Sequence, residues 1–314
     1  MRPSSPRDKG VSGSKVCINP RPFTGGFLRV LAYAKINLFL DVVGKRPDGY
    51  HDIVSIMQTV DLFDEIKICK TGYTSGFRFM TDSKEIPNDE SNLVARAAGL
   101  MVREYKIKES FNINLIKRIP VGAGLAGGSA DCAAVILGID RLFNLKAAPD
   151  ELLGIAKSLG ADVPFCMRRG TCLAEGVGEK LTPLAPHPEC FIVLAYPYIN
   201  VSTKEVFGKL CLGEKKQSEK LEKIISSLRN NDLTGVALSL YNVFTDLTGA
   251  EFPIVKKVIG MLKSCGAIGA SMTGTGSAVF GIFLDESDAQ EANCALAGDA
   301  KTYIVKPVGE GLIS

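Results

Sequence analysis

The sequence lacks several residues and patterns on which common protein classes depend. Its 314 residues contain no tryptophan and only two histidines, so a metal site built from histidines is not expected. Its nine cysteines form no C-x-x-C pair, and an odd number of such cysteines indicates reduced thiols in a cytosolic protein. No apolar run approaches the roughly 18 residues that a membrane-spanning helix needs. We therefore expect no dedicated metal site and no membrane segment.

A strong excess of charge is also lacking. The net charge of +3 is too small to indicate a nucleic acid or an anionic membrane as partner. Hydrophobic residues make up 46% of the chain and charged residues 23%, which is typical of a soluble protein. The length allows one large domain or two ordinary domains.

Acidic residues are nearly absent from the first 28 residues, which are rich in Ser, Pro, Gly, Arg and Lys and contain Asp8 as their one acid. This composition is typical of a flexible extension, and it also fits an organellar transit segment. Residues 1–28 are therefore left out of the predicted fold.

The most informative stretch is residues 120–130, which read PVGAGLAGGSA. Gly122, Gly124, Gly127 and Gly128 lie within seven residues, directly before a run of helix-forming residues. Glycine accepts positive φ and lets a ligand approach the main chain. A glycine loop that enters a helix directs several free N–H groups and the positive end of the helix dipole at one point, where a phosphate fits.

Three other interpretations of this loop fit the sequence less well. A structural turn explains one or two glycines but not four. A dinucleotide fingerprint, G-x-G-x-x-G, also matches, but it requires a strand ending in an acid about 20 residues further on. The sequence instead predicts an apolar helix over residues 131–145 and another that begins near Asp150, its N-cap candidate. No Gly-Lys pair is followed by Ser or Thr, so the Walker pattern is absent and a phosphate loop of another type fits best.

Ordered structure is predicted to begin with a strand over residues 30–42, where apolar residues alternate. Lys35 and Asn37 share the opposite face of this strand. A turn at residues 44–51 follows, because Pro-Asp-Gly is a turn signal, and it carries Tyr50 and His51 to a loop end. Further strands are predicted at 53–60, 65–69 and 111–117, and a helix begins after residues 88–92.

Asp162 stands out in the segment ADVPF, which follows a helix that ends at Gly160. Pro164 is expected to hold Val163 extended. Asp162 fits either a plain turn or cap residue or a partly desolvated catalytic carboxylate, because its neighbours are apolar. A second glycine loop, SMTGTGS, occupies residues 271–277.

The order of these blocks resembles that of the GHMP kinases, a family that includes galactose, homoserine, mevalonate and phosphomevalonate kinases. The matching segments read AKINLFLDV, RPDGYH, NLVARAA, GAGLAGGSAD, GADVPF, AEGVGEKLTPL and MTGTGS, and they span residues 30–284. The resemblance implies a two-domain α+β fold, with an N-terminal domain like ribosomal protein S5 domain 2 and a ferredoxin-like C-terminal domain. The expected division is 1–28 extension, 29–187 N-terminal ATP-binding domain and 188–314 C-terminal domain.

The resemblance also implies a reaction. The γ-phosphoryl group of ATP, accompanied by Mg²⁺, would pass to the 2-hydroxyl of CDP-methylerythritol, a small molecule of the non-mevalonate isoprenoid pathway. Asp162 matches the catalytic base and Lys35 its charge partner. The residues matched to ATP binding are Pro120, Val121, Gly122, Ala123, Gly124, Leu125, Ala126, Gly127, Gly128, Ser129, Lys117 and Asn92. The residues matched to substrate binding are Asn37, Tyr50, His51, Thr203, Phe207, Gly274 and Gly276.

Some positions differ from the family pattern. Ala126 replaces a common glycine, which restricts φ but removes no N–H donor. Lys204 and Glu205 replace smaller residues before Phe207, so Thr203 is the least secure substrate assignment.

Other functions remain open at this point. They are another GHMP kinase, a nucleotide-binding regulator without catalysis, and an RNA-binding protein suggested by the S5-like fold. The expected state is a monomer or homodimer in the bacterial cytoplasm, with a plastid location as the alternative if the leader is a transit segment.

Overall fold

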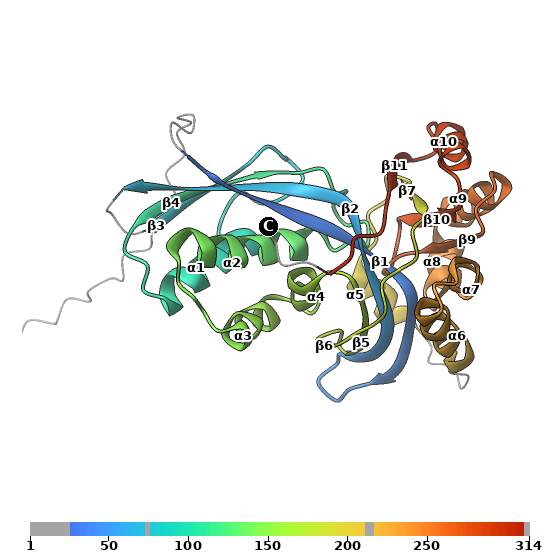
Figure 1. Cartoon of the computed structure of the whole chain (residues 1–314), viewed down its shortest axis with the longest axis horizontal. Helices are drawn as coiled ribbons and strands as arrows, with labels where there is room; N and C mark the ends of the chain where they lie inside the picture. Colours follow the sequence, from blue (N-terminus) through green and yellow to red (C-terminus); the bar gives the residue numbers. More distant parts are fainter. Residues whose placement is uncertain (1–25, 73–75, 211–216, 311–314) are drawn as a thin grey trace, which may run out of the picture.

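The computed structural model describes residues 26–72, 76–210 and 217–310, which form two β-sheets with helices packed on them (Figure 1). The first sheet has the strand order β3-β4-β2-β1-β8, with β5 and β6 attached to β2, and the second has the order β11-β7-β10-β9. The strands are β1 Leu28–Lys45, β2 His51–Gly72, β3 Gly76–Thr81, β4 Ser110–Ile116, β5 Thr171–Gly176, β6 Lys180–Pro183, β7 Phe191–Tyr196, β8 Tyr241–Asn242, β9 Gly269–Met272, β10 Val279–Phe283 and β11 Lys301–Val305. The helices are α1 Leu93–Glu104, α2 Gly127–Phe143, α3 Pro149–Leu159, α4 Val163–Arg168, α5 Thr203–Lys209, α6 Ser218–Arg229, α7 Leu233–Leu238, α8 Thr245–Glu251, α9 Pro253–Ser264 and α10 Glu286–Ala295.

The long hairpin of β1 and β2 organises the first sheet. The alternating pattern of residues 30–42 predicted β1 correctly, and the turn before His51 is confirmed. The two strands predicted at 53–60 and 65–69 are one strand, β2, which pairs with β1 on both sides of a register shift between Thr59 and Phe63.

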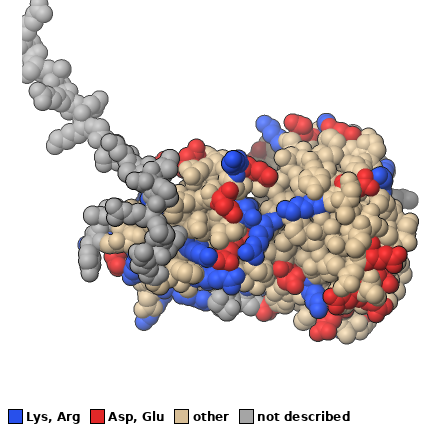
Figure 2. Space-filling model, turned by 90° about the horizontal axis from the view of Figure 1, so that it is seen from above, with Lys and Arg blue, Asp and Glu red and all other residues tan. Residues whose placement is uncertain are grey.

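The face of this sheet that carries no helix is seen in Figure 2, where Lys and Arg side chains form a band across it. Two cations contact aromatic rings in or next to β1: Lys67 Nζ lies 5.3 Å from the ring centroid of Phe27, and Arg169 Cζ lies 4.4 Å from that of Tyr33. Cations on aromatic faces gain electrostatic attraction while their stems cover apolar surface.

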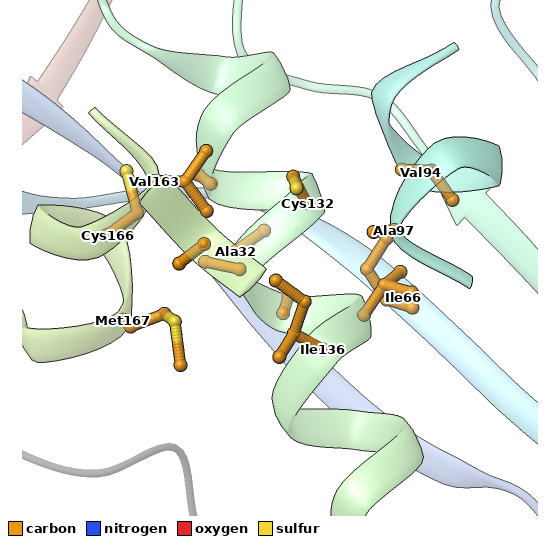
Figure 3. Close-up of a cluster of buried hydrophobic side chains, with 14 of the residues drawn as sticks. Ala32, Ile66, Val94, Ala97, Cys132, Ile136, Val163, Cys166 and Met167 are labelled. Atoms are coloured by element: carbon orange, nitrogen blue, oxygen red, sulfur yellow. The ribbon is translucent and has the colours of Figure 1, made fainter. Parts of the chain in front are cut away.

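The opposite face of the first sheet packs against α1, α2 and α4 (Figure 1). Figure 3 shows side chains of these helices, among them Ala97, Ile136 and Met167, meeting Ala32 and Ile66 of the strands. The apolar surface buried in this contact stabilises the fold by roughly 25 cal/mol per Å². This packing fixes the first turn of α2 and the start of α4 against β1.

Three boundaries in this region correct the sequence predictions. Helix α2 begins at Gly127 rather than at residue 131, so the end of the glycine loop is already its first turn. Helix α3 has Ala148 as N-cap, which places Asp150 inside the first turn. Val163 is not extended but starts α4, since a proline in the first turn of a helix needs no N–H partner.

The second sheet carries α9 and α10 on one side and shares its other side with the first sheet. Residues of β1, such as Ile36 and Leu38, are buried in one core with Ile192, Leu194 and Phe280 of β7 and β10. Strand β8 pairs with β1, and the chain after β11 returns to β2, where Val308 N donates to Thr59 O at 2.8 Å. The domain boundary between residues 187 and 188 stays a prediction. Strand β8 and the segment after β11 follow this boundary in sequence, but both pair with strands of the first sheet.

Candidate active site

A cavity of about 620 Å³ lies where the two sheets meet, and most of the predicted site residues line it. Its wall contains the whole loop from Pro120 to Ser129, and the other predicted residues on the wall are Lys35, Asn37, Asn92, Lys117, Asp162, Thr203, Phe207, Gly274 and Gly276. Tyr50 and His51 are not on this wall. The volume falls in the range of small-molecule sites.

The glycine loop forms one wall of this cavity. Gly122, Gly124 and Ala126 all have positive φ, at 68°, 80° and 55°. A Cβ on Gly124 would lie 2.4 Å from Thr273 O, so only glycine lets this loop approach the loop after β9. Helix α2 starts at Gly127, and the N–H groups of its first turn have no partner within the helix. Their partial positive charge faces a space that suits a phosphate.

Lys35 and Asp162 meet beside this loop, as predicted. Lys35 Nζ lies 4.0 Å from Asp162 Oδ2, and the side chains are 5% and 32% exposed, respectively. Lys35 Nζ also donates to Gly124 O at 3.0 Å, which ties the ammonium group to the glycine loop. Asp162 precedes α4 and makes no capping hydrogen bond, so its carboxylate is not used for holding the helix start.

The amide of Asn37 connects Lys35 to the second glycine loop. Asn37 Oδ1 accepts from Lys35 Nζ at 2.7 Å and from Gly274 N at 2.9 Å, and Asn37 Nδ2 donates to Ser55 Oγ at 2.8 Å. The residue is 1% exposed. The contact of Asn37 with substrate stays a prediction, and the contacts present in the protein position Lys35.

Lys117 is held by two buried acids that sequence reasoning missed. Its ammonium group donates to Asp64 and, at 2.9 Å, to Asp131. Burial would lower the pKa of Lys117, but the charges of Asp131 and Asp64 outweigh it and raise that pKa. Burial raises the pKa of Asp131, and Lys117 opposes this shift. The one sequence signal for this cluster was Asp131, an acid placed directly before the apolar run of residues 132–139 in α2.

Most of the predicted substrate residues line the cavity, whereas Tyr50 and His51 do not. Thr203 Oγ1 lies 3.2 Å from Thr275 Oγ1, which joins α5 to the second glycine loop. The rings of His51 and Phe207 lie 5.2 Å apart between centroids, and Phe207 reaches the cavity wall. Tyr50 is 65% exposed at the hairpin turn. The structure therefore brings His51 to Phe207 but leaves Tyr50 outside the cavity.

Asn92 has a structural use that explains its burial. Its side-chain oxygen accepts from Val94 N at 2.9 Å as the N-cap of α1, and its amide nitrogen donates to Pro87 O at 2.8 Å. Capping satisfies a free N–H group of the helix. A nucleotide contact of Asn92 stays a prediction.

This arrangement combines the glycine loop and the free N–H groups at the start of α2 with a carboxylate and an ammonium group. A carboxylate at Asp162 can accept the proton of an attacking hydroxyl, and Lys35 beside it can balance negative charge that moves during phosphoryl transfer. Both groups open to the cavity that the glycine loop borders.

Two parts of the chain match models of the GHMP kinase family. The model of the GHMP kinases N terminal domain matches residues 92–170, and that of the GHMP kinases C terminal matches residues 224–300. The 4-diphosphocytidyl-2-C-methyl-D-erythritol kinase of Caldicellulosiruptor saccharolyticus is 43% identical over 261 residues, which are 83% of this chain and 90% of the relative. The enzyme of the same name from Exiguobacterium sibiricum is 42% identical over 283 residues, 90% of this chain and 98% of the relative.

Solved structures agree with these matches. A crystal structure of 4-(cytidine 5'-diphospho)-2C-methyl-D-erythritol kinase has a TM-score of 0.77 and 32% identity, and the match covers 90% of this chain and all of that one. A homoserine kinase from Cytophaga hutchinsonii has a TM-score of 0.73 at 20% identity, covering 93% and 98% of the two chains, which shows a shared fold alone.

Proposed function

Because this chain belongs to the GHMP kinase family, we propose that it is an ATP-dependent kinase that phosphorylates the 2-hydroxyl of CDP-methylerythritol. It has the two-domain α+β fold of that family. The observation that carries the proposal is the position of Asp162, 4.0 Å from Lys35 and in one cavity with the glycine loop. The choice of acceptor rests on the similarity to relatives named for this substrate.

In the proposed reaction, the first turn of α2 and the loop before it hold the phosphates of ATP through main-chain N–H groups. Asp162 accepts the proton of the acceptor hydroxyl as it attacks the γ-phosphorus. Lys35, fixed by Asn37 Oδ1 and Gly124 O, balances charge on the transferred group. A positioned carboxylate contributes about 10²–10⁴-fold to such a step.

Mg²⁺ is proposed to accompany ATP and to neutralise part of its phosphate charge. The ion prefers oxygen ligands and keeps several waters. The Ser129 hydroxyl and the carboxylate of Asp131 stand on the cavity wall beside the loop, and Asp131 Oδ1 is buried without a hydrogen-bond partner among the described residues. These oxygens fit the ion together with those of the phosphates.

The acceptor is tested by comparing substrates in an assay coupled to ADP formation. CDP-methylerythritol should be phosphorylated with kcat/KM at least about 100-fold above that of mevalonate or homoserine, since a site that pairs polar groups rejects analogues that lack them. Equal turnover of mevalonate would assign the chain to another branch of the family. ATP binding without turnover of any acceptor would favour a regulator.

The cytosine end of the substrate is proposed to stack on Phe207, with His51 behind that ring. Stacking of a base on an aromatic ring contributes about 1–3 kcal/mol. Phe207→Leu should therefore raise KM for CDP-methylerythritol about 10- to 100-fold with KM for ATP unchanged. Phe143→Leu, at a half-buried ring away from the cavity, is the matched control. Efficient phosphorylation of free methylerythritol would contradict the proposed cytosine pocket.

No helix among the described residues is long and apolar enough to cross a membrane. The small-molecule partners proposed are ATP and CDP-methylerythritol, without nucleic acid. A monomer or homodimer in the bacterial cytoplasm is proposed, and a plastid location is the alternative if residues 1–28 direct transport.

A further inference from the structure

A second cavity of about 720 Å³ lies between the end of α2, α3, α4 and the hairpin of β5 and β6. In Figure 1 these elements lie on the helical side of the first sheet, with α3 and α4 below α2. None of the residues assigned to the proposed reaction lines this cavity. Its volume is that of a site for a small organic molecule.

The floor of the second cavity is apolar. It is made by side chains from all three helices and β6, namely Leu137, Leu152, Leu153, Pro164, Met167 and Leu181. Met167 and Leu152 are almost fully buried, at 6% and 5% exposure, so they belong to the protein core. A hydrocarbon group placed on this floor would remove from water both its own apolar surface and that of the floor.

The charge on the rim is positive, because four cations, Arg141, Lys157, Arg168 and Lys180, line the cavity against two acids, Asp140 and Glu179. Of these cations, Arg168 is paired with an acid outside the cavity, Glu310. Main-chain hydrogen bonds orient both acids, since Asp140 accepts from Ala147 N at 3.1 Å and Glu179 from Val177 N at 2.7 Å. Lys157 and Lys180 line the same cavity, and neither forms an ion pair with any residue of the described part of the chain. Lysine ammonium groups bind phosphate as point charges.

Two segments connect this cavity to the proposed active site. Pro164 and Met167 on its floor belong to α4, which begins directly after Asp162. Glu179 on its rim holds the turn at Val177, and Val177 lines the first cavity together with Asp162. A molecule that pushes on α4 or on this turn would move the carboxylate of Asp162, and positions of catalytic groups matter at the scale of 1 Å.

We propose that the second cavity is a regulatory site for a small molecule with an apolar body and a phosphate head. The apolar body lies on the floor between α2, α3 and α4, and Lys157 and Lys180 bind the phosphate. Occupation changes the turnover number through α4 and the turn at Val177. This effect on turnover rests on the proposed role of Asp162, whereas the binding does not.

Binding is tested by calorimetric titration of the full chain with octyl phosphate, in the presence of a saturating non-hydrolysable ATP analogue that fills the first cavity. One molecule should bind, and octanol and inorganic phosphate should each bind at least about tenfold more weakly. The double variant Lys157→Glu and Lys180→Glu should weaken binding by about tenfold or more, since it reverses both charges. Lys263→Glu with Lys223→Glu is the matched control, because Lys263 is also in the last turn of a helix and both are exposed.

Filling the cavity gives a second, independent test. Leu153→Trp places a large side chain on the half-buried floor and should abolish the binding of octyl phosphate while phosphoryl transfer continues. Octyl phosphate should change the kcat of the natural protein at least about twofold and leave that of Leu153→Trp unchanged.

Each other outcome overturns a defined part of the proposal. Binding that is equal in the natural protein and both cavity variants, or that disappears with the ATP analogue, would overturn the site. Binding without a change in kcat would overturn its regulatory role. The binding experiments use no phosphoryl acceptor, so their results can be interpreted even if CDP-methylerythritol is not the substrate.

Discussion

Lys35 is 5% exposed in its side chain, and a buried ammonium group is costly unless it is paired. It has an oxygen of Asn37 at 2.7 Å, the carbonyl of Gly124 at 3.0 Å and the carboxylate of Asp162 at 4.0 Å. The first two contacts hold the ammonium group in place, and the third is longer. The carboxylate of Asp162 therefore remains free to meet a hydroxyl in the cavity.

Replacement of Asp162 tests its role as the base. Asp162→Asn keeps the shape of the side chain but cannot take up the proton of the acceptor. We expect kcat to fall by about 10²–10⁴-fold with KM for ATP little changed. Steady-state kinetics with ADP detection measures both constants. Asp150→Asn, an exposed position in the first turn of α3, should leave kcat unchanged. Near-normal turnover of Asp162→Asn would show that Asp162 is not the catalytic base.

His187 gives a prediction for the pH dependence of stability. Its ring is 9% exposed, with Nδ1 2.7 Å from Pro188 O, and Nε2 is buried with no hydrogen-bond partner among the described residues. Burial lowers the pKa of His187, and the hydrogen bond to Pro188 O partly opposes this. The unfolded chain therefore binds a proton near pH 6.5 while the folded chain does not.

The free energy of unfolding should decrease as the pH falls below about 6.5, by at most about 1.4 kcal/mol per pH unit for this group. Above that pH the contribution is fully present. Urea unfolding at pH 5.5 and 7.5 measures the difference, and His187→Asn should reduce it because the variant cannot titrate. His51→Asn is the control at the other histidine. The same pH dependence in natural protein and His187→Asn contradicts the prediction.

At the scale of elements, the two glycine loops hold each other. A Cβ on Gly124 would meet Thr273 O, and a Cβ on Gly274 would lie 3.0 Å from the backbone of Gly124. Asn242 of β8 donates to Met272 O and Gly274 O at 2.8 Å each, which fixes the second loop. The shape of the first glycine loop thus depends on contacts between segments far apart in sequence.

Ala126 is the strained member of the first loop. It is the N-cap of α2 in the left-handed region, with φ 55° and ψ 29°. A non-glycine residue there costs roughly 1–2 kcal/mol, and the greater freedom of glycine in the unfolded chain cancels part of any gain. Ala126→Gly should raise the free energy of unfolding by up to about 1 kcal/mol, measured by urea unfolding.

A matched alanine in a helix should respond in the opposite direction. Ala250→Gly lies at an exposed position of α8 and should lower the free energy of unfolding by roughly 0.5–1 kcal/mol. If both variants lose stability equally, the backbone at Ala126 carries no strain. Binding of ATP to Ala126→Gly should be retained, because the N–H groups of the loop remain.

At the scale of the whole molecule, one core joins both halves of the chain. Apolar side chains of β1 and β2 pack with those of β7 and β10 without a solvent layer between them. The cavity with Asp162 lies at this junction, and its walls come from both halves. A shared core predicts that the halves unfold together.

Scanning calorimetry should show one transition in which the calorimetric and van't Hoff enthalpies agree. Ile36→Ala, in the shared core, should lower the free energy of unfolding by about 2–5 kcal/mol without dividing the transition. Two separate transitions, or a fragment of residues 188–314 that folds alone, would show that the halves are independent.

Much of the fold was predictable because local patterns decide it. The alternation that gives β1 and the helix start at residues 88–92 are both read from neighbouring residues. The errors in the helices fell at their starts, at Asp150, Val163 and Gly127, where a cap or a proline permits several boundaries, and the error in the strands was the division of β2 into two. The contacts of Lys67 with Phe27 and of Arg169 with Tyr33 could not be predicted, because each joins residues from segments that are far apart in sequence.

The sequence by itself determined the glycine loop and the family, because glycine positions and the order of motifs can be read directly from neighbouring residues. It also named Lys35 and Asp162, through that family resemblance. Only the tertiary structure decided their 4.0 Å contact, the two buried acids on Lys117 and the second cavity. These features depend on which side chains meet after β1, α2 and α4 pack together. Such packing is set by the whole core rather than by any one segment.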